Sequence, residues 1–168
     1  MELTELVNGC LSIFEVNDVD GLHDALFKCV TTNDIHKYSR FKALVKDLSV
    51  DWLQQIFEYY QADRKEKMQD YTPKSLAKLI AKLSKHNDVI DMCCGSGALT
   101  IQKWNEDSTS TFLLKEFDNN VLPYLMFNMG VRNIQCQIQH CDVLSGEVFK
   151  TYTINKGEEF GIYESNNI

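Results

Sequence analysis

The stretch DMCCGSGAL, which runs from Asp91 to Leu99, decides the fold class of this chain. A short apolar run at 89–90 precedes it and a helical pattern follows it. This order is typical of a glycine turn between a strand and a helix. An acidic residue, Glu116, directly follows the next apolar run at 111–115. A glycine turn after one strand and a carboxylate after the next are what a nucleotide pocket at the edge of a parallel sheet requires.

The same pattern narrows the class of ligand. The glycines let the backbone approach a ligand closely, and the carboxylate can accept hydrogen bonds from two ribose hydroxyls. Only one half of a G-x-G-x-x-G pattern is present, so pyrophosphate binding is not indicated and a nicotinamide enzyme is disfavoured. A nucleoside without phosphates fits better, and S-adenosylmethionine is the commonest cofactor of that kind.

Composition indicates a compact globular protein. The chain has 168 residues, a hydrophobic content of 44% and two prolines, which is enough for one domain with a real core. No apolar run approaches the roughly 20 residues of a membrane span. The first residues lack a basic region followed by an apolar core, so we expect no signal peptide and a cytoplasmic protein. The six cysteines include no C-x-x-C pair and are expected to be reduced thiols.

Charge and metal-ligand spacing argue against two further functions. The net charge of −7 does not favour unaided DNA binding, because phosphate contacts supply most of the affinity. A lysine-rich stretch at 64–85 is either a local basic patch or a solvated helix face. His140, Cys141 and the cysteines at 93, 94 and 136 are too loosely spaced for an ordinary zinc site, so we expect no metal.

Hydrophobic periodicity predicts an N-terminal helical region over 1–68 and a second domain over 69–168. Thr72-Pro73 is typical of a helix start, with Thr as N-cap and Pro in the first turn. Strands are expected at 89–92, 111–115, 134–139 and 160–163, and a helix at 121–129 that Asn119 or Asn120 caps and Gly130 ends. Strands that alternate with helices predict a parallel sheet with right-handed crossovers.

Four segments, from about Trp52 to the last residue, resemble in order the motifs of the adenine-N6 DNA methyltransferases of type I restriction-modification systems. QDYTP at 69–73 resembles Q-F-F-T-P, and DMCCGSG at 91–97 resembles D-P-x-C-G-S-G with Met92 in place of proline. EFD at 116–118 resembles E-I-D/N, and CDVL at 141–144 resembles G-D-x-L with Cys141 in place of glycine. The resemblance implies a Rossmann-like S-adenosylmethionine-dependent methyltransferase fold with an incomplete sheet, preceded by the helical region.

The resemblance also implies roles for individual residues. The 69–73 element helps to hold the methionine end of the cofactor, Glu116 binds the ribose, Phe117 packs on the adenine and Asp142 accepts from its exocyclic amine. Asp91 orders the glycine loop or reaches the amino group through a water. The expected cofactor-binding residues are Tyr71, Thr72, Pro73, Asp91, Cys93, Gly95, Ser96, Gly97, Glu116, Phe117, Asp142 and Val143.

The chain departs from the family at the catalytic element. The family carries N-P-P-F or N-P-P-Y, whereas this chain reads FGIYESNNI over 160–168. An ungapped alignment places Asn166 at the catalytic asparagine, Asn167 and Ile168 at the two prolines, and nothing at the aromatic residue. In the family, the asparagine and a proline carbonyl orient the target amine, and the aromatic ring stacks on the flipped base. We therefore expect methyl transfer to adenine in DNA to need a partner or a missing C-terminal part.

Several explanations of this ending remain open. The chain is a short relative that works with a partner subunit, a cofactor-binding module with a regulatory or vestigial role, or a fragment of a longer enzyme. The sequence Asn-Asn-Ile favours degeneration of the catalytic motif over truncation of a longer enzyme, because a truncated motif would keep its prolines.

Two rival functions also remain. One is a catalytically inactive cofactor-binding or interaction protein, and the other is a small-molecule or protein methyltransferase whose helical N-terminus closes the pocket.

Overall fold

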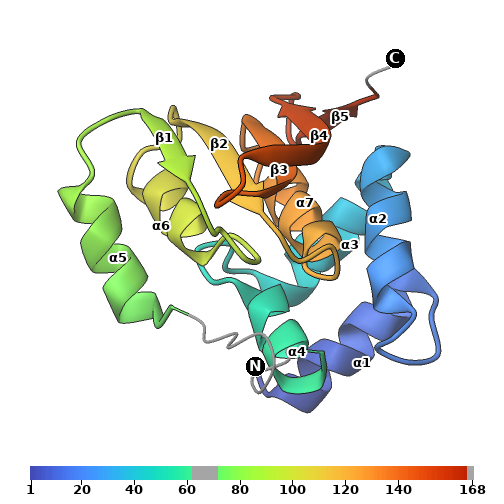
Figure 1. Cartoon of the computed structure of the whole chain (residues 1–168). Helices are drawn as coiled ribbons and strands as arrows, with labels where there is room; N and C mark the ends of the chain where they lie inside the picture. The colour runs from blue at the N-terminus through green and yellow to red at the C-terminus, as the bar shows by residue number, and fades with distance from the viewer. Residues whose placement is uncertain (62–71, 166–168) are drawn as a thin grey trace.

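The computed structural model describes residues 1–61 and 72–165, which form a mixed α/β structure (Figure 1). Tyr71 and Asn166 of the expected site lie outside the described residues. None of the described helices is long and apolar enough to cross a membrane. In chain order the elements are α1 (Leu3–Phe14), α2 (Leu22–Thr31), α3 (Ile35–Val45), α4 (Trp52–Tyr60), α5 (Lys74–Leu83), β1 (Asp88–Asp91), α6 (Ala98–Glu106), β2 (Thr111–Glu116), α7 (Leu122–Val131), β3 (Cys136–Asp142), β4 (Glu147–Asn155) and β5 (Ile162–Glu164).

The five strands form one mixed sheet in the order β1-β2-β3-β4-β5. β1, β2 and β3 are parallel, as expected, but β4 runs antiparallel to β3 and β5 antiparallel to β4. The prediction of an all-parallel sheet was therefore wrong. The cause is the tight turn at 143–146, where Gly146 adopts a φ of +78°, because such a turn returns the chain directly into an antiparallel neighbour. β4 was not predicted, and the expected fourth strand is β5 at the far edge of the sheet.

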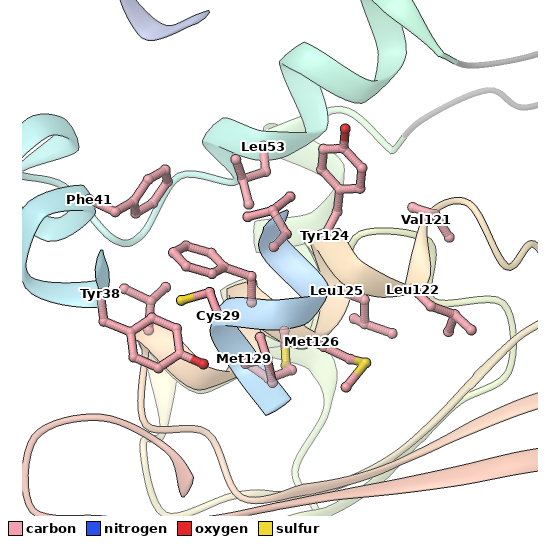
Figure 2. Packing of buried hydrophobic residues seen from close by; sticks show 14 of the residues in the cluster. Cys29, Tyr38, Phe41, Leu53, Val121, Leu122, Tyr124, Leu125, Met126 and Met129 are labelled. Carbon is pink, nitrogen blue, oxygen red and sulfur yellow. The ribbon is translucent and has the colours of Figure 1, made fainter. Parts of the chain in front are cut away.

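Helix α7 is the centre of the hydrophobic core. All ten of its residues are buried between the sheet and the N-terminal helices. The Phe127 ring lies 5.2 Å from Phe14, 5.0 Å from Tyr38 and 5.0 Å from Phe41, measured between ring centroids. Figure 2 shows side chains of the helical region gathered around this helix. One continuous core therefore joins the helical region to the sheet.

Two predicted helix boundaries were wrong. Gly130 lies inside α7 and does not end it. Its lack of a side chain serves packing, since a Cβ there would collide with the Tyr38 ring. The left-handed residue that follows the helix is Asn133, at a φ of +56°. At its start, α7 has Val121 as N-cap without a side-chain hydrogen bond, so neither Asn119 nor Asn120 caps it.

Helix α5 presents its large apolar residues to solvent. Its N-cap is Pro73 and its first residue is Lys74, so Thr72 is not the cap that the sequence predicts. Ala77 and Ala81 are its buried residues, and the helix packs on α6. The exposed apolar stripe consists of Leu76, Leu79, Ile80 and Leu83. Beside it, Ile90 of β1 and Met92 are exposed as well, and β1 pairs with β2 alone among the described strands.

Candidate functional site

The glycine loop between β1 and α6 has the conformation that its sequence predicts. Gly95 and Gly97 have φ values of +54° and +99°, which favour glycine strongly over residues with a side chain. Gly97 is the N-cap of α6, and its N–H donates to the Cys94 carbonyl at 2.9 Å. A Cβ at Gly97 would lie 2.8 Å from the Met129 methyl carbon of α7. The loop is therefore held tightly against the core helix.

Glu116, the last residue of β2, connects this loop to the loop after β2. Its Oε2 accepts a hydrogen bond from Gly95 N at 2.8 Å, and its Oε1 accepts from Phe117 N at 2.9 Å and Asp118 N at 2.8 Å. These bonds use three of roughly four acceptor directions of a carboxylate. One acceptor direction therefore remains on Oε2 for a ribose hydroxyl. A second ribose hydroxyl could bind the carboxylate only by replacing one of the backbone donors.

Asp91 and Cys93 lie close to Glu116. Burial raises the pKa of Asp91, and the nearby Glu116 charge raises it further, whereas hydrogen bonds donated by the Thr100 hydroxyl and the Cys93 backbone lower it. The Thr100 Oγ1 lies 3.4 Å from the Asp91 carboxylate. Burial also raises the pKa of the Cys93 thiol, with Glu116 and Asp91 adding to the effect. The structure thus brings the end of β1, the glycine loop and the end of β2 together.

Ser96 points into the protein rather than toward solvent. Its side chain is buried, and its Oγ donates to Asp51 Oδ2 at 2.6 Å. Asn128 of α7 donates through Nδ2 to Asp51 Oδ1 at 2.8 Å and to the Ser96 carbonyl at 2.9 Å. Arg132 donates to Asn128 Oδ1 at 2.8 Å and to the carbonyls of Leu48 and Val50. We call Asp51, Ser96, Asn128 and Arg132 the buried polar network.

The buried polar network connects the helical region to the glycine loop. Asp51 is the N-cap of α4, accepting from Gln54 N at 3.0 Å. Burial raises the pKa of Asp51, against the opposing charge of Arg132, and burial lowers the pKa of Arg132 to about 10. Sequence reasoning missed this set. An Asp directly before a helix is a recognisable cap, but no local pattern pairs it with Ser96 or with two polar residues of a core helix.

Thr72 and Pro73, at the start of α5, line a hollow of about 380 Å³, which we call the α4 hollow. The start of α6 closes it on another side through Ala98 and Gln102. Its lining residues are Val50, Asp51, Gln54, Gln55, Glu58, Thr72, Pro73, Lys74, Ala77, Ala98 and Gln102. Thr72 and Pro73, the described residues of the expected methionine-end element, therefore line the same cavity as the first turns of α6.

The residues expected around the adenine lie at the ends of β2 and β3. Phe117 is 65% exposed, and its carbonyl lies 3.0 Å from His140 Nε2 of β3. Asp142 ends β3 and forms the following turn, because its Oδ1 accepts from Leu144 N at 2.9 Å and Ser145 N at 3.4 Å. The Leu144 bond is the main cause of its lowered pKa. Val143, the next residue, is half-buried.

In the sequence Asn166 follows β5, which lies at the opposite side of the sheet from β1. β5 is separated from β1 by three strands, and its Tyr163 N donates to Asn33 Oδ1 at 2.7 Å, in the turn between α2 and α3. The chain up to Ser165 is therefore not brought beside the glycine loop by sheet pairing. Among the described residues, no group of three His, Cys, Asp or Glu side chains is arranged to hold a metal ion.

Comparison with known protein families agrees with this arrangement. The model of the N-6 DNA methylase family matches residues 45–163, which is most of the chain. The chain belongs to the N-6 DNA methylase family. The match includes α4, the glycine loop, β1 to β4 and the first two residues of β5, and thus Asp51 as well as Glu116. Searches of the curated proteins and of the solved structures found no significant match.

Family membership makes the chain an adenine-N6 methyltransferase-like protein, in a family that acts on DNA and generally uses S-adenosylmethionine. The carboxyl ends of β1, β2 and β3 carry Asp91, Glu116 and Asp142 at one edge of the sheet. That edge is where ligands bind in open α/β sheets.

Proposed function

We propose that this chain binds S-adenosylmethionine at the edge formed by the ends of β1, β2 and β3. The observation that carries the proposal is the 2.8 Å hydrogen bond from Gly95 N to Glu116 Oε2, which joins the glycine loop to the acidic strand end. The adenosine lies between Glu116, Phe117 and Asp142, and the sulfonium lies near Asp91. No metal takes part in this chemistry, because the sulfonium methyl is transferred directly to a nitrogen.

The chain works as part of an adenine-N6 DNA methyltransferase of a restriction-modification system, located in the cytoplasm. Its substrate is DNA, and a partner subunit or a further part of the polypeptide supplies the element that positions the target adenine. The placement of β5 across the sheet from β1 supports this need. The exposed Ile90 and Met92 support it too, as does the fact that β1 has β2 as its one neighbour among the described strands, because strands of parallel sheets are normally covered.

The second candidate function is a catalytically inactive protein that binds the cofactor. The sequence Asn-Asn-Ile at 166–168 and the net charge of −7 favour it, since they weaken both the positioning of an amine and the attraction of DNA. Both candidates share the cofactor site and differ only in methyl transfer.

Calorimetric titration of S-adenosylmethionine into the purified chain tests the shared site. Saturable binding at micromolar concentration supports it, and the absence of binding by a folded sample overturns it. Transfer of a radiolabelled methyl group to adenine-rich DNA, measured with the chain alone and with cell extract, then separates the candidates. Incorporation that requires both chain and extract supports the methyltransferase component, and no incorporation in either case supports the inactive protein.

A further inference from the structure

Three aromatic side chains gather at the carboxyl ends of β2 and β3. They are Phe117 directly after β2, His140 of β3 and Phe149 of β4, and we call them the aromatic cluster. Phe117 is 65% exposed and Phe149 is 46% exposed. Aromatic rings that remain exposed at the ligand-binding edge of an open α/β sheet are suited to a flat ligand that stacks on one of them.

A β-bulge brings Phe149 into the aromatic cluster. His140 pairs with Lys150 across the β3–β4 ladder. The next residue of β3, Cys141, pairs with Val148, so Phe149 is an extra residue of β4. In a regular strand Phe149 would point to the opposite face from Lys150, because successive side chains alternate. The bulge instead turns its ring onto His140, with the ring centroids 4.9 Å apart. Bulges re-aim side chains in this way and are over-represented next to active sites.

The aromatic cluster holds both the backbone and the ring of Phe117. His140 Nε2 lies 3.0 Å from the Phe117 carbonyl oxygen, to which its Nε2–H tautomer donates a hydrogen bond. The ring centroids of Phe149 and Phe117 are 6.3 Å apart, with 58° between the ring planes. A base inserted between two rings would need roughly 7 Å, twice the carbon–carbon contact distance. Phe149 therefore supports the Phe117 ring from the side and leaves its exposed face to a ligand.

We infer that Phe149, together with His140, is a positioning residue that holds the Phe117 ring in place to stack on the adenine of the cofactor. An exposed ring loses rotamer freedom when a ligand stacks on it, so a ring that is already held binds more tightly. This inference rests on the proposed function and deepens it, because it gives the β3–β4 hairpin a role in recognising the base. Neither His140 nor Phe149 lies in the four motif-like segments of the sequence.

Calorimetric titration of S-adenosylhomocysteine, the demethylated cofactor, tests the inference. Phe149→Ala should weaken binding roughly fivefold, as expected when a stacking ring loses one aromatic contact. Phe149→Tyr keeps the ring and should bind as wild type does, whereas Phe149→Leu keeps only apolar bulk and should bind as weakly as Phe149→Ala. His140→Ala should act in the same direction. 5′-Methylthioadenosine, which carries the adenosine without the amino-acid end, should be weakened by the same factor.

A double-mutant cycle separates positioning from direct contact with the ligand. Phe117→Ala removes the stacking ring and should weaken binding by itself. Because Phe149 acts through that ring, adding Phe149→Ala to Phe117→Ala should weaken binding no further. Phe149→Leu replaces Phe149→Ala in the cycle if circular dichroism shows that the smaller side chain prevents folding. The matched control is Val148→Ala, which changes the neighbouring residue at 47% exposure and should bind both ligands as wild type does.

The outcomes that contradict the inference are distinct from failure of the proposed function. Wild-type affinity in Phe149→Leu overturns the inference, as does a loss that multiplies with the loss in Phe117→Ala, since Phe149 would then contact the ligand independently. A loss for S-adenosylhomocysteine alone places the effect away from the base and overturns it too. Unchanged affinity in Phe117→Ala overturns it while the site at Glu116 stands. Wild type that binds neither ligand overturns the proposed function, and the inference with it.

Discussion

Glu116 has two tasks at the residue scale. Its carboxylate holds the glycine loop and the loop after β2 together through three backbone donors. In the proposed site it also binds the ribose, for which one acceptor direction on Oε2 remains. In that proposal a single side chain shapes the pocket and contacts the ligand, so its loss should affect both affinity and loop order.

The Glu116→Ala variant should bind S-adenosylmethionine more weakly by about 1–3 kcal/mol, because charge-assisted hydrogen bonds to the ribose are lost. Calorimetric titration measures this difference. Glu5→Ala, which removes an exposed carboxylate from α1, serves as the control and should keep the wild-type affinity. Unchanged affinity in Glu116→Ala would remove this residue from the site.

Gly97 and Gly146 form a matched pair, because both have a positive φ and only Gly97 is crowded. Gly97→Ala and Gly146→Ala should each lower the free energy of unfolding by about 1–2 kcal/mol through backbone strain. Only Gly97→Ala should abolish cofactor binding, since its Cβ presses on Met129 and shifts the loop. Urea denaturation and calorimetry measure the two effects, and tight binding by Gly97→Ala would show that the loop is not the pocket.

At the scale of the elements, α4 contacts the glycine loop through the buried polar network. Asp51 caps α4 and holds Ser96 with the same carboxylate, while Asn128 and Arg132 bring α7 into the network. The position of α4 and the conformation of the loop are therefore coupled through buried hydrogen bonds. Polar groups buried in this way are costly to leave without partners.

Asp51→Asn should change how stability depends on pH. Burial raises the pKa of Asp51, so between its ordinary pKa and the raised value the folded chain binds more protons than the unfolded chain. In that window, which begins at about pH 4, this group makes the free energy of unfolding fall as pH rises. The variant lacks this carboxyl group. The free energy of unfolding of wild type minus that of the variant, measured by urea denaturation, should therefore decrease as pH rises across the window. Ser96→Ala, which keeps the carboxylate, should retain the wild-type slope, and an identical slope in Asp51→Asn would contradict the assignment.

The exposed stripe of α5 can be tested against the buried face of α4. Leu79 is 55% exposed and Leu53 is fully buried. Leu53→Ala should cost about 2–5 kcal/mol of unfolding free energy through cavity formation, whereas Leu79→Ala should stay within about 0.5 kcal/mol. Urea denaturation of both variants measures this contrast. A large loss in Leu79→Ala would mean that the stripe is covered in the isolated chain.

Local patterns predicted the elements of the site, and non-local contacts decided their arrangement. The three parallel strands, the glycine turn and the acid after β2 all follow from periodicity and residue type near one another in sequence. The apolar spacing of α5 identified a helix, but spacing cannot show whether a stripe faces the core or a surface. The β4 strand, the place of β5 and the network around Asp51 depend on contacts between residues far apart in the chain. The cofactor-binding roles assigned from the sequence stay predictions.

At the scale of the whole molecule, the helical region and the sheet share one core around α7. Phe14 of α1 and Tyr38 and Phe41 of α3 all contact Phe127. A boundary near residue 68 would therefore separate two parts that bury the same helix. Such sharing favours cooperative unfolding of the described chain.

The two tryptophans report on the two parts, since Trp52 lies in α4 and Trp104 in α6. Each single-tryptophan variant isolates one of these reporters: Trp104→Phe leaves Trp52, and Trp52→Phe leaves Trp104. In each variant, the urea midpoint from fluorescence should equal the urea midpoint from circular dichroism. Coincident midpoints indicate one cooperative unit. Midpoints that differ between fluorescence and circular dichroism would instead support two separately folding domains.

The contact between Asn33 and Tyr163 has a consequence for how the chain evolves. Asn33 donates to the Tyr163 carbonyl at 3.1 Å and accepts from its N–H at 2.7 Å, much as a neighbouring strand would. Tyr163 is the last residue of the segment that the family model matches, and Asn33 lies before its first residue. The helical region is therefore not an interchangeable module. A graft from another lineage would have to bring its own partner for the final strand, so the two parts are expected to be inherited together.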